Sequence, residues 1–518
     1  MSEEASNSQT GVRSFLLKGG SLIALATFLE RGFVFLANVL SVRFGGVENY
    51  GAYGLALQAA GFMAGQASLG IGMVAWRFAA EYPVGHEFHR DYVHRIVYLS
   101  VGLALISALL MLIFAWPMAN WFYDKPQFYP ILLVTVYSAP AFVMLDAMRG
   151  LMIGMSYYRG QVLLSSIFGI TMLLLIPGAS MQGARWMVIT HAICALIACL
   201  SLLIILNRKY HLKLMSPNIN KVPIWPMLRF GMVQLGSGLL VSMVMMVVTA
   251  MLVRHGSTEN TMALALVPLG FLLAQGTVWM VSIGVSHYPL FGFREVAYYN
   301  AASAIRSMVS IVPTMLSQTM MSLMTNKRGE AFGGADRMVL INTWISAMFL
   351  LPVTTIGQIL MFWLLPFLYG PELEGGVLPA CLLLAVASIH MVSLPACNRL
   401  NVVSPRSIVL ANILWAVVVL CTAFFLTPRL GATGVCLALL IAHTNSTIAC
   451  VFLLNRFGEL PVNLLFITIL SILGAVVPLV FLDAHRNTLQ TGTNGIILLI
   501  TLTITVLLWL IRGQLRSK

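Results

Sequence analysis

Long apolar runs separated by short polar stretches follow one another along almost the whole chain. Most of them reach 18 residues or more, the length that a helix needs to cross a bilayer. They lack the ten-residue alternation of membrane barrel strands. The pattern predicts an all-α polytopic membrane protein with about 14 spans. We expect these spans at about 19–43, 52–76, 95–116, 130–154, 161–178, 185–206, 263–290, 301–325, 338–366, 376–398, 406–427, 434–455, 462–482 and 494–511.

The composition agrees with a membrane protein. Of the 518 residues, 59% are hydrophobic and 9% are charged, whereas soluble domains carry about 25% charged residues. A net charge of +13 could indicate a nucleic-acid partner, but in a membrane protein Lys and Arg gather in cytoplasmic loops. We therefore expect no nucleic acid. Residues 1–14 are polar and lack a cleavage signal, so we expect a cytoplasmic N-terminus and an uncleaved first helix.

An internal repeat organises the spans. The sequence Phe44-Gly45-x-x-Glu48 returns as Phe291-Gly292-x-x-Glu295, and Tyr123-Asp124-Lys125-Pro126 has a counterpart in Tyr369-Gly370-Pro371-Glu372. His191 matches His443, and further pairs follow in the same order at similar offsets. The repeat predicts two six-helix lobes. The expected organisation is an N-lobe at 15–208, a basic connector at 209–261, a C-lobe at 262–456 and a two-helix tail at 457–518.

Both lobes place most of their Lys and Arg on the flanks that are cytoplasmic when the N-terminus is cytoplasmic. The lobes are therefore expected to be parallel, around a central cavity. The apolar segment 225–252 conflicts with this count, because parallel six-span lobes need an even number of crossings between them. It could be re-entrant, lie in the interface, form a hairpin broken at Gly236-Ser237-Gly238, or be a true span.

Motifs for soluble chemistry are absent from the sequence. It has no GxxxxGK[ST] and no G-x-S-x-G, and His86 and His89 are three residues apart rather than the four of HExxH. The seven cysteines lie in apolar segments without a CxxC pair, which is typical of packing residues. We expect no enzymatic activity, no cofactor and no metal.

Charged residues inside spans are costly and often line a transport pathway. Glu30 and Arg31 lie near the middle of the first span, and Thr27, Arg31 and Asn38 share one face of that helix. The pair could line a pathway or neutralise itself in a helix interface. We favour the pathway, because the matching stretch of the second lobe, near Thr277, is uncharged.

Other polar residues of the spans leave similar alternatives. Asp146 and Arg149 are spaced to pair within one helix, and Arg149 could instead be an anchor near the inner end. Arg306 could reach outward or face the space between lobes. His191 and His443 could be buried structural residues or take part in proton coupling, and the same two alternatives hold for His390, which has no mate. We predict Arg31, Asn38, Arg149 and Arg306 for the substrate cavity, and Glu30, Asp146, His191 and His443 for ion coupling.

The sign of these charges suggests the cargo. Arginines outnumber carboxylates among the cavity candidates, which suits a phosphate or diphosphate, because guanidinium matches it with two parallel hydrogen bonds. A transporter of cationic drugs would more naturally show surplus carboxylate. Aromatic residues at the outer ends predict an interfacial belt, with sugar stacking as the alternative. These residues are Trp116, Trp121, Phe122, Tyr123, Phe362, Trp363, Phe367 and Tyr369.

Several motifs resemble those of polysaccharide transporters. The stretch 41–53 (SVRFGGVENYGAY) looks like the R-x-x-G-x-x-x-(Y/F)-G-x-Y turn after the first helix of that family. Leu69-Gly70-Ile71-Gly72 with Arg77 and Glu81 is similar to the pattern that follows it. The stretches 296–302, 368–372 and 427–434 resemble motifs of the second lobe. The chain is thus similar to the Wzx-type branch of the multidrug/oligosaccharidyl-lipid/polysaccharide (MOP) superfamily.

That resemblance implies twelve to fourteen helices in two lobes and a basic cavity. It implies ion-coupled flipping of an undecaprenyl-diphosphate-linked oligosaccharide across a bacterial inner membrane, for exopolysaccharide or O-antigen synthesis. The implied partners are this lipid carrier, membrane lipids and polysaccharide polymerase or export machinery. A multidrug or small-molecule antiporter of the same fold is the alternative. A membrane-embedded glycan polymerase or acyltransferase is disfavoured, because the outer loops are short.

Overall fold

The structure is a computed structural model that describes residues 21–81, 87–210, 223–254, 291–315, 317, 335–456, 464, 467–469 and 471–476. Within these residues the secondary structure is helical and contains no strand. Eight of the described helical segments are long and apolar enough to cross a membrane. The predicted all-α polytopic class is therefore confirmed, whereas the total of about 14 spans stays a prediction. The expected spans 263–290 and 494–511 lie outside the described residues.

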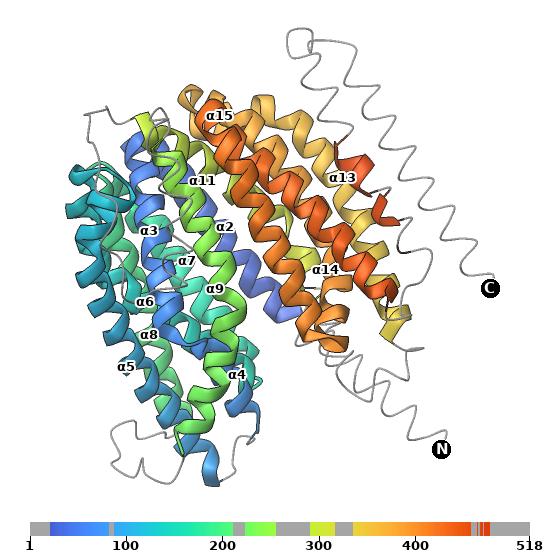
Figure 1. Cartoon of the computed structure of the whole chain (residues 1–518). Coiled ribbons are helices and arrows are strands. Elements are labelled where there is room, and N and C mark those ends of the chain that lie inside the picture. Colours follow the sequence, from blue (N-terminus) through green and yellow to red (C-terminus); the bar gives the residue numbers. More distant parts are fainter. Residues whose placement is uncertain are drawn as a thin grey trace. The chain divides into compact units, whose positions relative to one another are not determined.

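The chain divides into two compact units, residues 1–297 and 298–518 (Figure 1). In the first unit, α2 packs mainly against α7, while α4, α5 and α8 pack against α6, and α9 packs against α3 and α4. The helices of this unit are α2 (Ser21–Gly45), α3 (Val47–Ser68), α4 (Ile71–Glu81), α5 (Glu87–Pro117), α6 (Tyr129–Gly154), α7 (Tyr158–Ser180), α8 (Ala184–Tyr210) and α9 (Trp225–Val253). Helix α11 (Phe291–Val309) crosses the boundary between the units.

The expected span 52–76 is interrupted in the structure. Helix α3 ends at Ser68, and Leu69 (φ +48°) and Gly70 (φ +64°) both adopt the left-handed backbone conformation before α4 begins. The Gly70 amide donates to the Ser68 hydroxyl at 3.3 Å, and the Gly70 carbonyl accepts from Met73 and Val74. The prediction of one continuous helix was wrong, because apolar periodicity continues through a break that only two residues produce.

Helices α4 and α6 cross at backbone contact. A Cβ atom added at Gly150 of α6 would lie 2.0 Å from the Gly72 carbonyl oxygen, and one at Gly154 would lie 2.5 Å from the Trp76 carbonyl oxygen. Gly150 and Gly154 form a GxxxG pair, the spacing that places two small residues on one helix face. The two helices therefore approach more closely here than any side chain would allow.

The segment 225–252 is one uninterrupted helix, α9, which excludes a hairpin broken at 236–238. It belongs to the first unit, because a Cβ at Gly231 would lie 2.3 Å from the Leu69 carbonyl oxygen. Near its start, Phe230 lies beneath the Arg77 guanidinium, 4.5 Å from the ring centroid. Beyond its other end, Arg254 donates to the Trp121 carbonyl. Burial lowers the pKa of Arg254 from its ordinary value, and the nearby Asp124 opposes that shift.

The second unit contains the rest of α11, α13 (Ala335–Tyr369), η6 (Pro371–Gly376), α14 (Val377–Val403) and α15 (Pro405–Arg456). Helix α14 packs against α13 and α15. The sequence predicts two spans, 406–427 and 434–455, where the structure has α15. The non-helical backbone of Gly431 (φ 56°, ψ −132°) divides this helix into two limbs, as predicted.

One element of the predicted repeat is visible in both units. Tyr123 ends the π-helix η2 (Met118–Phe122) and Tyr369 ends α13, and both side chains are buried. The next residues, Asp124 (φ 55°) and Gly370 (φ 103°), have positive φ, and each unit then has a 3₁₀ helix that starts with Pro, η3 (Pro126–Phe128) or η6.

The predicted aromatic belt needs one correction. Tyr123 and Tyr369 are core residues of the repeated turn and have no interfacial exposure. By contrast, Trp116, Trp121, Trp363 and Phe367 are exposed, as an interfacial belt requires.

Gly150→Ala should lower the apparent melting temperature of the purified protein by several degrees. The added methyl group would enter the backbone of α4, and overpacking of this kind costs about 1–3 kcal/mol. Gly65→Ala is the matched control, because Gly65 is also helical and a Cβ atom added there would meet no neighbouring atom within 4 Å. Fluorescence-detected thermal unfolding in detergent measures both variants, and equal melting temperatures would contradict the close crossing.

Candidate functional site

The predicted polar residues of the first unit come from three helices. Glu30, Arg31 and Asn38 lie on α2, Asp146 and Arg149 lie on α6, and His191 lies on α8. In the second unit, Arg306 lies on α11 and His443 on α15. The structure therefore brings together some of these residues and distributes the others over separate sites.

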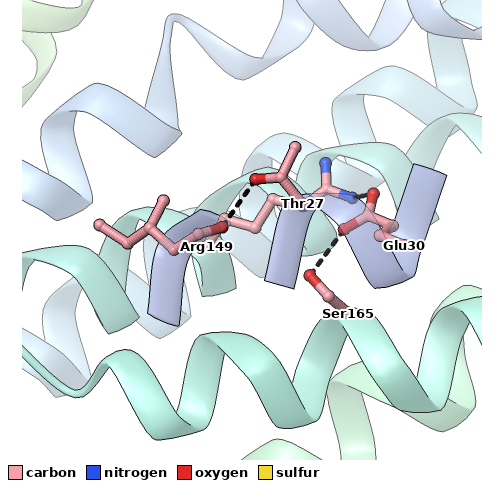
Figure 2. Close-up of polar contacts among 5 residues, drawn as sticks. Thr27, Glu30, Arg149 and Ser165 are labelled. Carbon is pink, nitrogen blue, oxygen red and sulfur yellow. Dashed lines mark hydrogen bonds and ion pairs between the residues drawn. The ribbon is translucent and has the colours of Figure 1, made fainter. Parts of the chain in front are cut away.

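Glu30 is the centre of the first site, which Figure 2 shows. Arg149 Nη2 forms an ion pair with Glu30 Oε1, and Ser165 Oγ of α7 donates to Glu30 Oε2 at 2.7 Å. The carboxylate thus accepts from two helices other than its own. The side chain of Glu30 is 19% exposed and that of Arg149 is 35% exposed, so the pair is only partly shielded from its surroundings.

The structure shows an ion pair that the sequence did not predict, between Glu30 and Arg149. The pairs considered from the sequence were Glu30 with Arg31 and Asp146 with Arg149. Spacing along one helix suggested those pairs, whereas the observed partner of Glu30 lies 119 residues away. Ser165 was not predicted either, because the serine pair 165–166 in an apolar span carries no charge to mark it.

Arg31 adds a second positive charge beside this pair. Its guanidinium interacts electrostatically with both Glu30 and Arg149. Thr27, one turn earlier, uses its hydroxyl to donate to the Ile23 carbonyl at 2.9 Å within the same helix (Figure 2). Asn38 is partly buried two turns beyond Arg31, about 10 Å further along α2. The cluster of Glu30, Arg31, Arg149 and Ser165 therefore holds two guanidinium groups and one carboxylate.

Asp146 binds the backbone of another helix. Its Oδ2 accepts from the Gly72 amide at 3.0 Å, in the first turn of α4. The carboxylate therefore caps a helix N-terminus, where unpaired amides and the helix dipole favour negative charge. This contact follows the break at Leu69 and Gly70, which exposes the first amides of α4.

His191 is enclosed by aromatic side chains. Its Nδ1 shares a hydrogen bond of 2.9 Å with the Tyr53 hydroxyl, and the rings of Phe142 and Phe168 lie 5.3 and 5.5 Å away. The side chain is buried. Its Nε2 is also buried and has no hydrogen-bond partner in the described part of the chain, so a structural role and proton coupling both stay predictions.

His443 has different neighbours in the second unit. The His390 ring lies 4.8 Å from it, and the Trp415 ring lies 5.6 Å from it. Arg306 interacts electrostatically with both histidines and is partly buried. Among the described residues, no carboxylate forms an ion pair with Arg306. The sequence leaves His390 the same two roles as the other histidines, but the predicted ion-coupling set does not include it; the repeat offset aligns it with Phe142, a neighbour of His191.

Comparison with known proteins gives one family match. The profile described as "Polysaccharide biosynthesis protein" matches residues 16–322. No curated protein sequence matches the chain.

Solved structures show the same fold. The lipid II flippase MurJ in its inward closed conformation is 15% identical, with a TM-score of 0.66 over 95% of this chain and 98% of that one. An inward-facing multidrug resistance MATE family transporter of the MOP superfamily is 16% identical, with a TM-score of 0.59 over 83% and 94%. A MOP superfamily transporter from Pyrococcus furiosus is 16% identical, with a TM-score of 0.53 over 85% and 95%. At these identities the likeness is one of fold.

Glu30→Gln should lower the apparent melting temperature, because it leaves the Arg149 charge without its ion-pair partner. The double variant Glu30→Gln/Arg149→Gln should recover part of that loss, since neither charge then remains. Thermal unfolding of the single and double variants in detergent measures this coupling. Glu48→Gln, at an exposed glutamate, should leave the melting temperature unchanged. Strictly additive effects of the two substitutions would show that the pair contributes nothing.

Asp146→Asn should fold with nearly the stability of the parent protein, because the side-chain amide oxygen can still accept from the Gly72 amide. Asp146→Ala should be markedly less stable, since loss of a helix cap typically costs about 0.5–2 kcal/mol. Thermal unfolding of the two variants distinguishes them. The capping role would be refuted if both lost the same amount of stability.

Proposed function

The chain belongs to the polysaccharide biosynthesis protein family, and we propose that it is a flippase for polyprenyl-diphosphate-linked oligosaccharides. It would move this substrate from the cytoplasmic to the periplasmic leaflet by alternating access, for exopolysaccharide or O-antigen synthesis. The family match and the MOP transporter fold support a flippase or transporter role, and the match confirms the family resemblance predicted from the motifs.

The proposed substrate class rests on the excess of arginine over carboxylate among the candidate residues. The candidate residues are three arginines (Arg31, Arg149 and Arg306) and two carboxylates, since Asp146 as well as Glu30 interacts with Arg149. Arg306 has no ion pair with a described carboxylate. An uncompensated cation inside a membrane is costly and is retained where it binds something. A diphosphate presents several charged oxygens to planar guanidinium groups, which bind such oxygens two at a time.

The geometry of the Glu30 cluster suggests how the substrate is held and released. In the described conformation Glu30 forms an ion pair with Arg149, so an incoming diphosphate would compete with Glu30 for the same guanidinium. Asn38 would supply a neutral donor and acceptor for sugar hydroxyls. Glu30, Asp146 and His191 remain the proposed ion-coupling residues of the first unit, and Glu30 differs from the other two in pairing with a cation.

The protein is a multi-pass membrane protein, and we propose the bacterial inner membrane with a cytoplasmic N-terminus. The distribution of Lys and Arg over the loops supports this orientation. We also propose that the two lobes are parallel and surround a central cavity, and that a polymerase or export protein is a partner. The second candidate, an antiporter of multidrug or other small molecules, has the fold in its favour but would need a different charge balance at the cluster.

Removal of the protein from its host should cause lipid-linked repeat units to accumulate on the cytoplasmic leaflet. Leaflet-specific labelling of the lipid-linked glycan measures this accumulation, and its absence would refute the flippase function. Accumulation of an exported small molecule instead would favour the antiporter.

Arg31→Ala should reduce flipping about tenfold or more while leaving membrane insertion intact, because a hydrogen bond to a charged group contributes about 1.5–3 kcal/mol. The rate is measured by restoring the Arg31→Ala protein to the deletion strain and following the lipid-linked glycan. Arg406→Ala, at an exposed arginine at the start of α15, is the matched control and should flip at the parent rate. Parental flipping by Arg31→Ala at equal expression would make Arg31 structural.

A further inference from the structure

We propose that Cys397 and Cys450 form an oxidisable thiol pair in the second unit, which a two-electron oxidant such as hydrogen peroxide converts into a disulfide. The disulfide joins the C-terminal end of α14 to that of α15. This modification site is independent of the proposed transport function. It gives two of the seven cysteines a role beyond the packing role that the sequence predicts.

The two sulfur atoms are in direct contact. The Cys397 thiol donates to Cys450 Sγ at 3.2 Å, and the two helices that carry them pack together. Both residues are free cysteines. A disulfide bond is about 2.05 Å long, so an approach of roughly 1 Å would complete it. The fold thus brings together two thiols that are 53 residues apart in the sequence.

Both cysteines lie at the same distance from the ends of their helices. Cys397 is six residues before Val403, where α14 ends, and Cys450 is six residues before Arg456, where α15 ends. Six residues of helix span about 9 Å. The distribution of Lys and Arg predicts that these ends face the cytoplasm, where the glutathione pool keeps thiols reduced. The thiol pair is therefore the resting form, and the disulfide is the form expected under oxidative conditions.

The surroundings give the two thiols different parts in the reaction. Cys450 is buried in an apolar cluster with Ala396, Leu400 and Leu454, whereas Cys397 packs against this cluster and keeps part of its surface exposed. An oxidant therefore reaches Cys397 first, and Cys450 resolves the product. Thiolate is scarce in apolar surroundings, so the first step is slow, but the second step joins sulfurs that are already in contact and is fast.

The reaction balances with one molecule of hydrogen peroxide. The Cys397 sulfur attacks the peroxide, an S–O bond forms as the O–O bond breaks, and the products are a sulfenic acid and one water. The Cys450 sulfur then attacks the Cys397 sulfur, and an S–S bond forms as the S–O bond breaks. The hydroxyl group leaves with the thiol proton as a second water. Two thiols thus lose two electrons, and one peroxide is reduced to two waters.

The first unit provides an internal control. Cys199 is the repeat mate of Cys450 and is also buried. At the repeat offsets Cys397 corresponds to residues 145–151, which contain no cysteine. The thiol pair is therefore specific to the second unit, and Cys199 should not enter a disulfide under the same treatment.

The test counts the thiols of the full chain in nanodiscs. A Cys421→Ser background removes an exposed cysteine that would otherwise link two copies, and six cysteines remain. Hydrogen peroxide, followed by denaturation and maleimide labelling, should remove two of the six thiols, and dithiothreitol should restore both. Mass spectrometry of an unreduced digest should identify the peptide that joins Cys397 to Cys450. Cys199→Ala, the matched control, should still form this disulfide, whereas Cys397→Ala should form none.

Cys450→Ala tests the order of the two steps. Without the second thiol, the sulfenic acid of Cys397 should persist and be trapped by dimedone, while the protein that keeps Cys450 should give little adduct. The disulfide should raise the apparent melting temperature by several degrees, because a cross-link across 53 residues restricts the unfolded chain. An unchanged thiol count, a disulfide between other cysteines, equal dimedone adducts with and without Cys450, or an unchanged melting temperature would overturn the proposal.

Discussion

Charge inside an apolar bundle has to be balanced by a neighbour, and in the first unit this constraint acts at Glu30. The Glu30 carboxylate takes Arg149 from α6 on one oxygen and Ser165 from α7 on the other. On a water-exposed surface such an ion pair would contribute little. Within the membrane, insertion of one charge at the centre of a helix costs about 2.5–3.5 kcal/mol, so each member depends on the other for its position.

The sequence predicted what is local and missed what is distant. Helix positions follow from hydrophobic length, which is a property of each segment, and most predicted spans agree with the described helices to within several residues. The partner of Glu30 could not be found this way, because α2 and α6 are far apart in the sequence and only the folded structure brings Arg149 to Glu30. The break at Leu69 was missed because apolar length was followed through it, although Gly70 in the Leu69-Gly70-Ile71-Gly72 motif is the residue type that favours positive φ.

The repeat behaves differently in its turns and in its interior. The buried tyrosine, the positive φ and the proline-started 3₁₀ helix are present in both units, because the chain must reverse direction in the same way. The surroundings of the histidines have diverged, from Phe142 and Phe168 to His390 and Trp415. The two units thus share the structure of their turns but differ in the side chains around their histidines. For this reason the repeat located the elements but did not assign roles to their residues.

The backbone contact of Gly150 with α4 has a mechanical consequence for its neighbour Arg149. With no side chain between the two backbones, α4 and the C-terminal end of α6 are packed directly against each other, which holds the Cα of Arg149 in place. The Arg149 side chain can rotate, but its Cα cannot move independently of α4. Glu30 belongs to the more exposed helix α2, which is not part of this α4–α6 contact. Opening of the ion pair therefore requires rotation of the Arg149 side chain or movement of α2, because the Cα of Arg149 is fixed against α4.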